Sequence, residues 1–239
     1  MSILADRLAR VRARIVAASL EAGRDAAEVA LIAVSKTREA DEIAALHRLG
    51  QRAFGESYLQ EALTKLDALA ALDLEWHFIG PLQANKTRRI AERFSWVHSV
   101  DRVKLAQRLS AQRPATLPPL NVCLQVNISG EASKAGATPA EVTALATEIA
   151  SLPQLRLRGL MAIPAPANDS ESARRPFRAL RELAERLQER GLPVDTLSMG
   201  MSDDLEAAIL EGATQVRVGT ALFGPRPPHH TLPGKPGSQ

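Results

Sequence analysis

Three separated segments of the chain carry residue types that together could hold an aldehyde and a phosphate group. Lys36 directly follows the apolar run LIAVS (31–35), and a lysine whose pKa is lowered by burial or by a cationic neighbour is suited to forming a Schiff base with an aldehyde. The segment SMGMS (198–202) leads straight into a helical pattern, and N–H groups at a helix start bind phosphate with help from the helix dipole. The third segment carries Arg217 and ends in a glycine and a threonine (219–220).

One ligand explains all three segments, because pyridoxal phosphate needs a lysine for its aldehyde, a cup for its phosphate and a partner for its ring. Hydroxyl groups add hydrogen bonds to a phosphate, and a glycine such as Gly200 lets the backbone approach an anion closely. Each segment also has a simpler explanation: an exposed lysine, a helix cap completed by Asp203 and Asp204, or an arginine paired with a carboxylate. The combination favours a cofactor site in which Lys36 forms the Schiff base and the other members are Ser198, Gly200, Met201, Ser202, Arg217, Gly219 and Thr220.

These segments need a frame that brings the ends of distant strands together. Short apolar runs alternate with helical patterns along the chain, and such runs suit parallel strands that are covered on both faces. Eight alternations in 239 residues predict an α/β fold, a single (β/α)8 TIM-type barrel, in which reactive groups gather at the carboxyl ends of the strands. A doubly wound open sheet is the competing arrangement. The eight runs lie at 31–35, 53–55, 76–80, 96–100, 120–128, 157–163, 195–199 and 214–219.

The fifth run favours the barrel over the open sheet. Apolar residues occupy its even positions from 122 to 128, whereas Cys123 and polar residues occupy the odd positions from 121 to 127. One side of this strand would therefore face helices and the other side would face a barrel interior. Because a barrel closes, its eighth strand pairs with its first, which places Lys36 and Arg217 at neighbouring strand ends.

An extra helix precedes the first strand. Leu4, Leu8, Val11 and Ile15 recur at helical spacing until Gly23 supplies a stop, and arginines on another face of this helix are expected to be solvated. We expect one domain over residues 1–224. A flexible tail rich in proline and glycine is expected over residues 225–239.

Composition excludes several classes of function. Thirty Lys and Arg residues against 27 Asp and Glu residues give a net charge of +3, too balanced for a charge-driven binder of nucleic acid or of a membrane surface. No apolar run is long enough to span a membrane, and the N-terminus has no secretory-type core, so we expect a cytoplasmic protein. Cys123 is the only cysteine, which excludes an internal disulfide and a thiolate zinc cluster.

Two histidines on predicted strands, His77 and His98, have no neighbouring carboxylate or thiol at the spacing of a metal site. We therefore expect packed core histidines and no metal. The position of His77 near the barrel mouth makes it, with Ser57, a further candidate for lining the cofactor pocket.

Longer motifs resemble the pyridoxal phosphate homeostasis proteins, the YggS/PROSC family. The resemblance runs from about residue 30 to residue 224, although Ser57 stands where that family commonly has asparagine. It implies a barrel similar to the N-terminal domain of alanine racemase, with pyridoxal 5′-phosphate on Lys36, phosphate held by the SMGMS and RVGT segments, and Arg217 near the pyridine nitrogen. The motifs are AVSKT (33–37), FGESYLQE (54–61), WHFIGPLQANK (76–86), HSVD (98–101), QVNISGEASKAG (125–136), RGLMAIP (158–164), SMGMSDD (198–204) and VRVGTALFG (216–224).

The resemblance implies a monomeric carrier that buffers pyridoxal phosphate and delivers it to apo forms of enzymes that use this cofactor, with effects on amino-acid and keto-acid pools. The alternative is a pyridoxal-phosphate-dependent racemase or decarboxylase of broad specificity, and a third is an interaction protein regulated by the cofactor. Racemisation needs proton donors on both faces of the substrate carbon, and the chain has one tyrosine, Tyr58. An arginine at the pyridine nitrogen leaves that nitrogen neutral and weakens carbanion stabilisation. We therefore expect a carrier rather than an enzyme.

Overall fold

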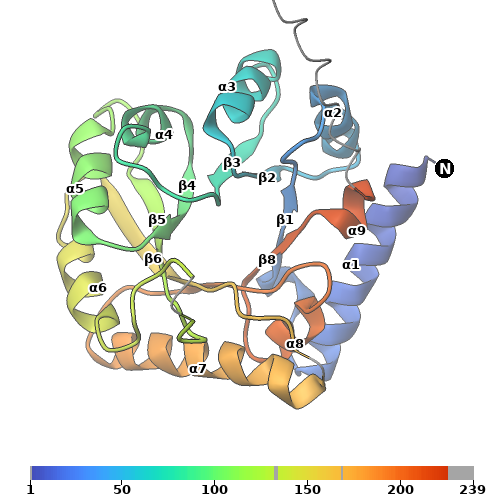
Figure 1. Cartoon of the computed structure of the whole chain (residues 1–239). Helices are drawn as coiled ribbons and strands as arrows, with labels where there is room; N and C mark the ends of the chain where they lie inside the picture. The colour runs from blue at the N-terminus through green and yellow to red at the C-terminus, as the bar shows by residue number, and fades with distance from the viewer. Residues whose placement is uncertain (1, 132–133, 168, 226–239) are drawn as a thin grey trace, which may run out of the picture.

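Eight parallel strands close into a barrel, and helices form a ring around it (Figure 1). The computed structural model describes residues 2–131, 134–167 and 169–225. Strands pair in chain order, and β8 pairs with β1, where Arg217 lies opposite Ile32. The predicted (β/α)8 barrel is therefore confirmed. Its strands are β1 (Ala30–Val34), β2 (Ala53–Glu56), β3 (Glu75–Phe78), β4 (Trp96–Val100), β5 (Leu120–Gln125), β6 (Leu155–Met161), β7 (Thr196–Ser198) and β8 (Gln215–Val218).

The helices follow the strands in regular alternation, with one extra helix at the start of the chain. Among the described residues, none of these helices is long and apolar enough to cross a membrane. The predicted tail lies outside the described residues except for Pro225. The helices are α1 (Ile3–Glu21), the 3-10 helix η1 (Ala26–Glu28), α2 (Ala40–Arg48), α3 (Leu59–Ala68), α4 (Thr87–Arg93), α5 (Val103–Gln112), α6 (Val142–Ala150), α7 (Ser170–Glu189), α8 (Leu205–Leu210) and α9 (Thr220–Phe223).

Helix α1 packs beside α8 and α9 at the closing point of the barrel (Figure 1). Three members of its predicted apolar stripe, Leu8, Val11 and Ile15, are buried, and Leu4 is partly buried. Two of its arginines are not simply solvated. Arg7 donates to the carbonyl of Phe223 at 2.8 Å, and Arg14 donates to the Glu206 carboxylate at 2.6 Å. Helix α1 is therefore hydrogen-bonded to both α8 and α9.

The two faces of β5 differ as its sequence predicts: apolar side chains lie on one face, and Cys123 and polar side chains lie on the other. Val122 and Leu124 are buried in the main apolar cluster between strands and helices. Cys123 points to the other side of the strand, because successive side chains alternate, and it packs there with Trp96 and Met161. Burial raises the pKa of the Cys123 thiol to about 12, so this cysteine is a small buried hydrophobe inside the barrel.

Gly159 is required by a close approach of two strands. It lies opposite Thr196, and a Cβ atom at this position would be 1.8 Å from the Thr196 carbonyl oxygen. We predict that Gly159→Ala lowers the free energy of unfolding by more than about 3 kcal/mol, since backbone must move to make room. Urea unfolding followed by circular dichroism measures this loss.

The control is Gly191→Ala, which replaces a glycine of positive φ that has no atom within 4 Å of a built Cβ. Its expected loss is about 1–2 kcal/mol, the cost of a left-handed backbone alone. Equal losses for the two variants would contradict the steric argument.

Candidate functional site

A cavity of about 210 Å³ opens at the carboxyl ends of the strands, the end at which TIM barrels hold their ligands. Residues that directly follow β1, β2, β3, β6, β7 and β8 contribute to its wall. Six of the eight residues predicted for the site line it, and so does Ser57. The lining consists of Val34, Lys36, Ser57, Ile79, Ile163, Met201, Ser202, Asp203, Arg217, Gly219 and Thr220.

The backbone on both sides of Lys36 is held in place. The Ser35 carbonyl accepts from the Lys65 ammonium at 2.7 Å, and the Thr37 N–H donates to Glu61 Oε1 at 2.6 Å. Thr37 has a φ of 64°, a left-handed conformation that costs a residue with a side chain roughly 1–2 kcal/mol. The bond to Glu61 offsets this cost, so the chain turns sharply just after Lys36.

Lys65 belongs to a buried charge cluster that the sequence analysis missed. Its ammonium contacts Glu56 at 2.8 Å and also pairs with Glu61, one helical turn earlier on α3. Glu56 accepts in addition from the Ser35 hydroxyl at 2.7 Å. Burial raises the pKa of Glu56, and the nearby Lys65 charge opposes that rise. The spacing of four residues between Glu61 and Lys65 is a sequence signal for such a pair, but nothing in it shows that the pair faces Lys36.

Arg217 is buried below the cavity, where its hydrogen bonds go to neutral groups. It donates to Ser198 Oγ at 2.6 Å and to the Ala162 carbonyl at 2.9 Å. Burial lowers its pKa to about 10. The simpler explanation of Arg217, a carboxylate partner, is therefore not what its contacts show. Ser198 contacts Arg217 and does not line the cavity.

The loops after β7 and β8 meet on one side of the cavity. Gly219 caps α9, and its carbonyl accepts from the Leu222 and Phe223 N–H groups, both at 2.9 Å. Ser202 Oγ accepts from the Ala221 N–H at 3.3 Å, which joins the two loops. The Met201 N–H donates to Asp204 at 2.5 Å, so part of the donor set is satisfied by an aspartate at the start of α8, as the simpler explanation expects.

The structure gives Gly200 a packing role. Its φ is +92°, and a Cβ atom there would lie 2.6 Å from Ala208 Cβ. The absent side chain therefore makes room for α8. Gly200 is also not among the residues that line the cavity.

His77 does not reach the cavity either, which corrects its placement as a pocket residue. The ring lies inside the barrel, stacked on Trp96 at 5.4 Å between ring centres. Its two nitrogens bond to Glu75 and His98. The expectation of packed, hydrogen-bonded core histidines is confirmed for His77 and for His98, which is also buried.

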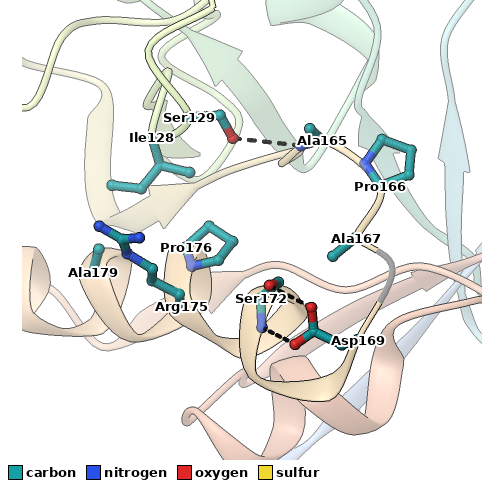
Figure 2. Close-up of a pocket in the computed structure, with 10 residues that line it drawn as sticks. All are labelled: Ile128, Ser129, Ala165, Pro166, Ala167, Asp169, Ser172, Arg175, Pro176 and Ala179. Atoms are coloured by element: carbon teal, nitrogen blue, oxygen red, sulfur yellow. Dashed lines mark hydrogen bonds between the residues drawn. The ribbon is translucent and has the colours of Figure 1, made fainter.

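A larger cavity of about 680 Å³ lies over the start of α7 (Figure 2). Two of its polar groups are engaged within its own wall: Asp169 accepts from the Ser172 N–H at 2.9 Å, and Ser129 Oγ accepts from the Ala165 N–H at 3.4 Å. Among the residues that the structure describes, its lining includes one cation, Arg175, and no lysine. The smaller cavity is therefore the better candidate for covalent chemistry.

Comparisons with known proteins agree along almost the whole chain. Residues 8–227 match the family model described as alanine racemase, N-terminal domain. The pyridoxal phosphate homeostasis protein of Pseudomonas aeruginosa is 62% identical over 226 residues, which cover 95% of this chain and 97% of that protein. The protein of the same name from Escherichia coli (strain K12) is 53% identical over 232 residues, with coverage of 95% and 98%.

Solved structures give the same picture. PipY of Synechococcus elongatus PCC7942 with PLP bound matches with a TM-score of 0.79 at 39% identity, over 92% of this chain and 100% of that chain. Alanine racemase from Corynebacterium glutamicum matches with a TM-score of 0.66 at 18% identity, over 93% of this chain and 62% of that chain, a likeness of fold alone. The chain therefore belongs to the alanine racemase N-terminal domain family and, within it, to the pyridoxal phosphate homeostasis proteins.

Proposed function

We propose that the chain binds pyridoxal 5′-phosphate in the 210 Å³ cavity and serves in its homeostasis by holding and delivering it. The observation that carries this proposal is the meeting of Lys36, Arg217 and Thr220 around one cavity at the carboxyl end of the barrel. The names of its relatives and the PLP-bound PipY structure support it.

The donor set of the cavity fits this cofactor. The volume is below the roughly 300–1,000 Å³ of sites for drug-sized ligands, which suits a small molecule. When bound, the cofactor supplies an aldehyde carbon that forms a double bond to an amine nitrogen with loss of water. Lys36 is the lysine whose amine would take this role. The hydroxyls of Ser202 and Thr220 and the backbone of residues 219–220 would hold the phosphate, and Arg217 would face the ring.

The cavity favours holding the cofactor over reacting with it. Arg217 can only donate hydrogen bonds, so it would leave a pyridine nitrogen unprotonated and weaken the ring as an electron sink. A racemase mechanism would need a tyrosine beside the cofactor. Tyr58 stands at the start of α3, is 54% exposed and does not line the cavity. These observations favour the carrier over the racemase or decarboxylase.

We further propose that apo forms of enzymes that use pyridoxal phosphate are the recipients, that delivery takes place in the cytoplasm, and that the chain acts as a monomer. Lys36 is half-buried rather than enclosed and lines a cavity that opens at the carboxyl ends of the strands. Ile163 and Met201 at the cavity wall are each 38% exposed. They offer an apolar rim that a recipient enzyme could cover.

Lys36→Ala should abolish the visible absorbance of the loaded protein and the covalent attachment of cofactor after borohydride reduction, because the reactive amine is gone. The fold should survive, because the hydrogen bonds that hold Ser35 and Thr37 use their backbone groups and the Ser35 hydroxyl, and none of them uses the Lys36 side chain. Mass spectrometry of reduced protein measures the attachment. Lys104→Ala, an exposed lysine of α5, is the control; a pyridoxyl group found on a lysine other than Lys36 would refute the assignment.

Thr220→Val should weaken retention of pyridoxal 5′-phosphate by about one to two factors of ten, because a hydrogen bond to a charged group is worth roughly 1.5–3 kcal/mol. Binding of pyridoxal, which lacks the phosphate, should not change. Fluorescence titration with both ligands measures the difference. An equal loss for both would place the phosphate away from Thr220.

The carrier and the enzyme are separated by one pair of measurements on loaded protein. We expect transfer of cofactor to an apo-enzyme faster than release into solution allows, and no exchange of the α-hydrogen of D- or L-amino acids in deuterated water. Exchange at a useful rate without assisted transfer would favour the enzyme instead.

A further inference from the structure

A single hydrogen-bond chain runs through the interior of the barrel. It begins at Glu75, whose Oε1 lies 2.7 Å from His77 Nε2. His77 Nδ1 is 2.9 Å from His98 Nε2, and His98 Nδ1 is 2.8 Å from Ser198 Oγ. The chain ends at Arg217, whose Nη1 lies 2.6 Å from Ser198 Oγ. Side chains of four strands, β3, β4, β7 and β8, therefore form one connected path.

The two ends of this path lie at opposite ends of the barrel. Glu75 is the first residue of β3, and its side chain is 50% exposed. Ile79, which follows the same strand, lines the cavity, so β3 spans the distance between the open rim and the site. His77, His98, Ser198 and Arg217 are all buried. The path thus connects a carboxylate at the amino-terminal rim with the buried cation below the cavity.

The chemistry of its members gives the path one direction. A guanidinium only donates and an ionised carboxylate only accepts, whereas a neutral imidazole donates from one nitrogen and accepts at the other. If His77 donates to Glu75 from Nε2, its Nδ1 must accept from His98 Nε2–H. His98 Nδ1 must then accept from the Ser198 hydroxyl, whose oxygen accepts from Arg217. Every donor along the path points from Arg217 toward Glu75.

In the opposite direction, His77 Nε2 would be an acceptor that faces the Glu75 carboxylate, which can also only accept. Ser198 Oγ can accept two hydrogen bonds, so the serine end permits either direction and only the carboxylate end decides. The charge states required are those that the surroundings favour. The hydrogen bond from His77 lowers the pKa of Glu75, with smaller contributions from the Trp96 side chain and Arg158. Burial lowers the pKa of His77 and, still further, that of His98.

We infer that Glu75, acting through His77, His98 and Ser198, fixes the orientation of the Arg217 guanidinium below the cavity, which makes these four side chains positioning residues for the group that Arg217 contacts there. Ser198 and the Ala162 carbonyl take one hydrogen from each terminal nitrogen of Arg217, which leaves its other N–H groups for the cavity. In the proposed function that group is the pyridine ring, so the role in cofactor binding rests on the proposed function, whereas the path itself does not.

This path orients a buried cation, Arg217, without placing a carboxylate beside the group that it contacts in the cavity. A carboxylate beside the ring would favour a protonated pyridine nitrogen and an electron-sink cofactor. Here the carboxylate stands three neutral side chains away from Arg217, so the cation is oriented without a hydrogen bond to a carboxylate. A molecule that stores the cofactor benefits from this, because the ring is held in a form poorly suited to reaction.

The first test uses protein without cofactor. Nuclear magnetic resonance of ¹⁵N-histidine-labelled protein at pH 7 should show His77 and His98 as neutral imidazoles that carry hydrogen on Nε2. An imidazolium or a hydrogen on Nδ1 in either ring would overturn the direction of the path.

Glu75→Gln tests whether the carboxylate sets that direction. An amide can donate or accept, so we expect both histidines to populate two tautomers in this variant. The matched control, Glu189→Gln on the exposed side of α7, should leave the wild-type spectrum. Unchanged tautomers in Glu75→Gln would remove Glu75 from the proposal.

The second test asks whether the path acts through Arg217 on the ring. His98→Phe keeps a ring of similar size, and Ser198→Ala breaks the path with a smaller change that is safer for folding. Each should lower the affinity for pyridoxal 5′-phosphate about tenfold, the effect of one hydrogen bond. Neither should change the affinity for an analogue with a benzene ring in place of the pyridine.

The outcomes separate the two proposals. Equal loss for both ligands, or no loss for either, in folded variants would refute the positioning role. If wild-type protein bound neither ligand, the proposed function would fail, and the histidine tautomers alone would decide whether the path exists.

Discussion

The Lys65 ammonium lies where the ends of β1 and β2 meet α3, and three acceptors from these elements surround it. Removing one partner of a buried ion pair typically costs about 3–5 kcal/mol, because the other charge is left uncompensated. This cluster therefore holds its members firmly, and through Ser35 and Glu61 it also holds the backbone on both sides of Lys36. Lys36 therefore stands on a segment that cannot shift without breaking a buried charge network.

The opposite side of the cavity depends on a different support. Helices α8 and α9 are short, and short helices gain little stability of their own. Helix α1 supplies what they lack: Arg14 donates to the Ser202 carbonyl at 2.9 Å as well as to Glu206, and Arg7 donates to the carbonyl of Phe223. The extra N-terminal helix is thus part of the scaffold of the site, although it contributes no residue to the lining.

Local patterns in the sequence predicted the barrel well, because each strand is a short apolar run and β5 shows its two faces by alternation. Contacts between distant residues had no such signal. The path from Glu75 to Arg217 joins side chains that are up to 100 residues apart between neighbours, and no motif spacing reveals it. The motif TPAE (138–141) has the pattern of a helix start, with a threonine, a proline and a glutamate three residues after the threonine. Glu141 does accept from the Thr138 N–H, yet residues 139–141 form a turn and α6 begins at Val142.

Because the barrel closes between β1 and β8, neighbouring parts of the cavity wall are synthesised at different times. Lys36 and Thr220 lie in one cavity wall but are 184 positions apart in the chain (220 − 36). At synthesis rates of about 5–20 residues per second, roughly 9–37 s pass on the ribosome between the two. Throughout that interval neither the α9 turn nor Arg217 is present beside Lys36, so the cavity wall is incomplete. The cavity wall can be completed only after the last strand has been translated.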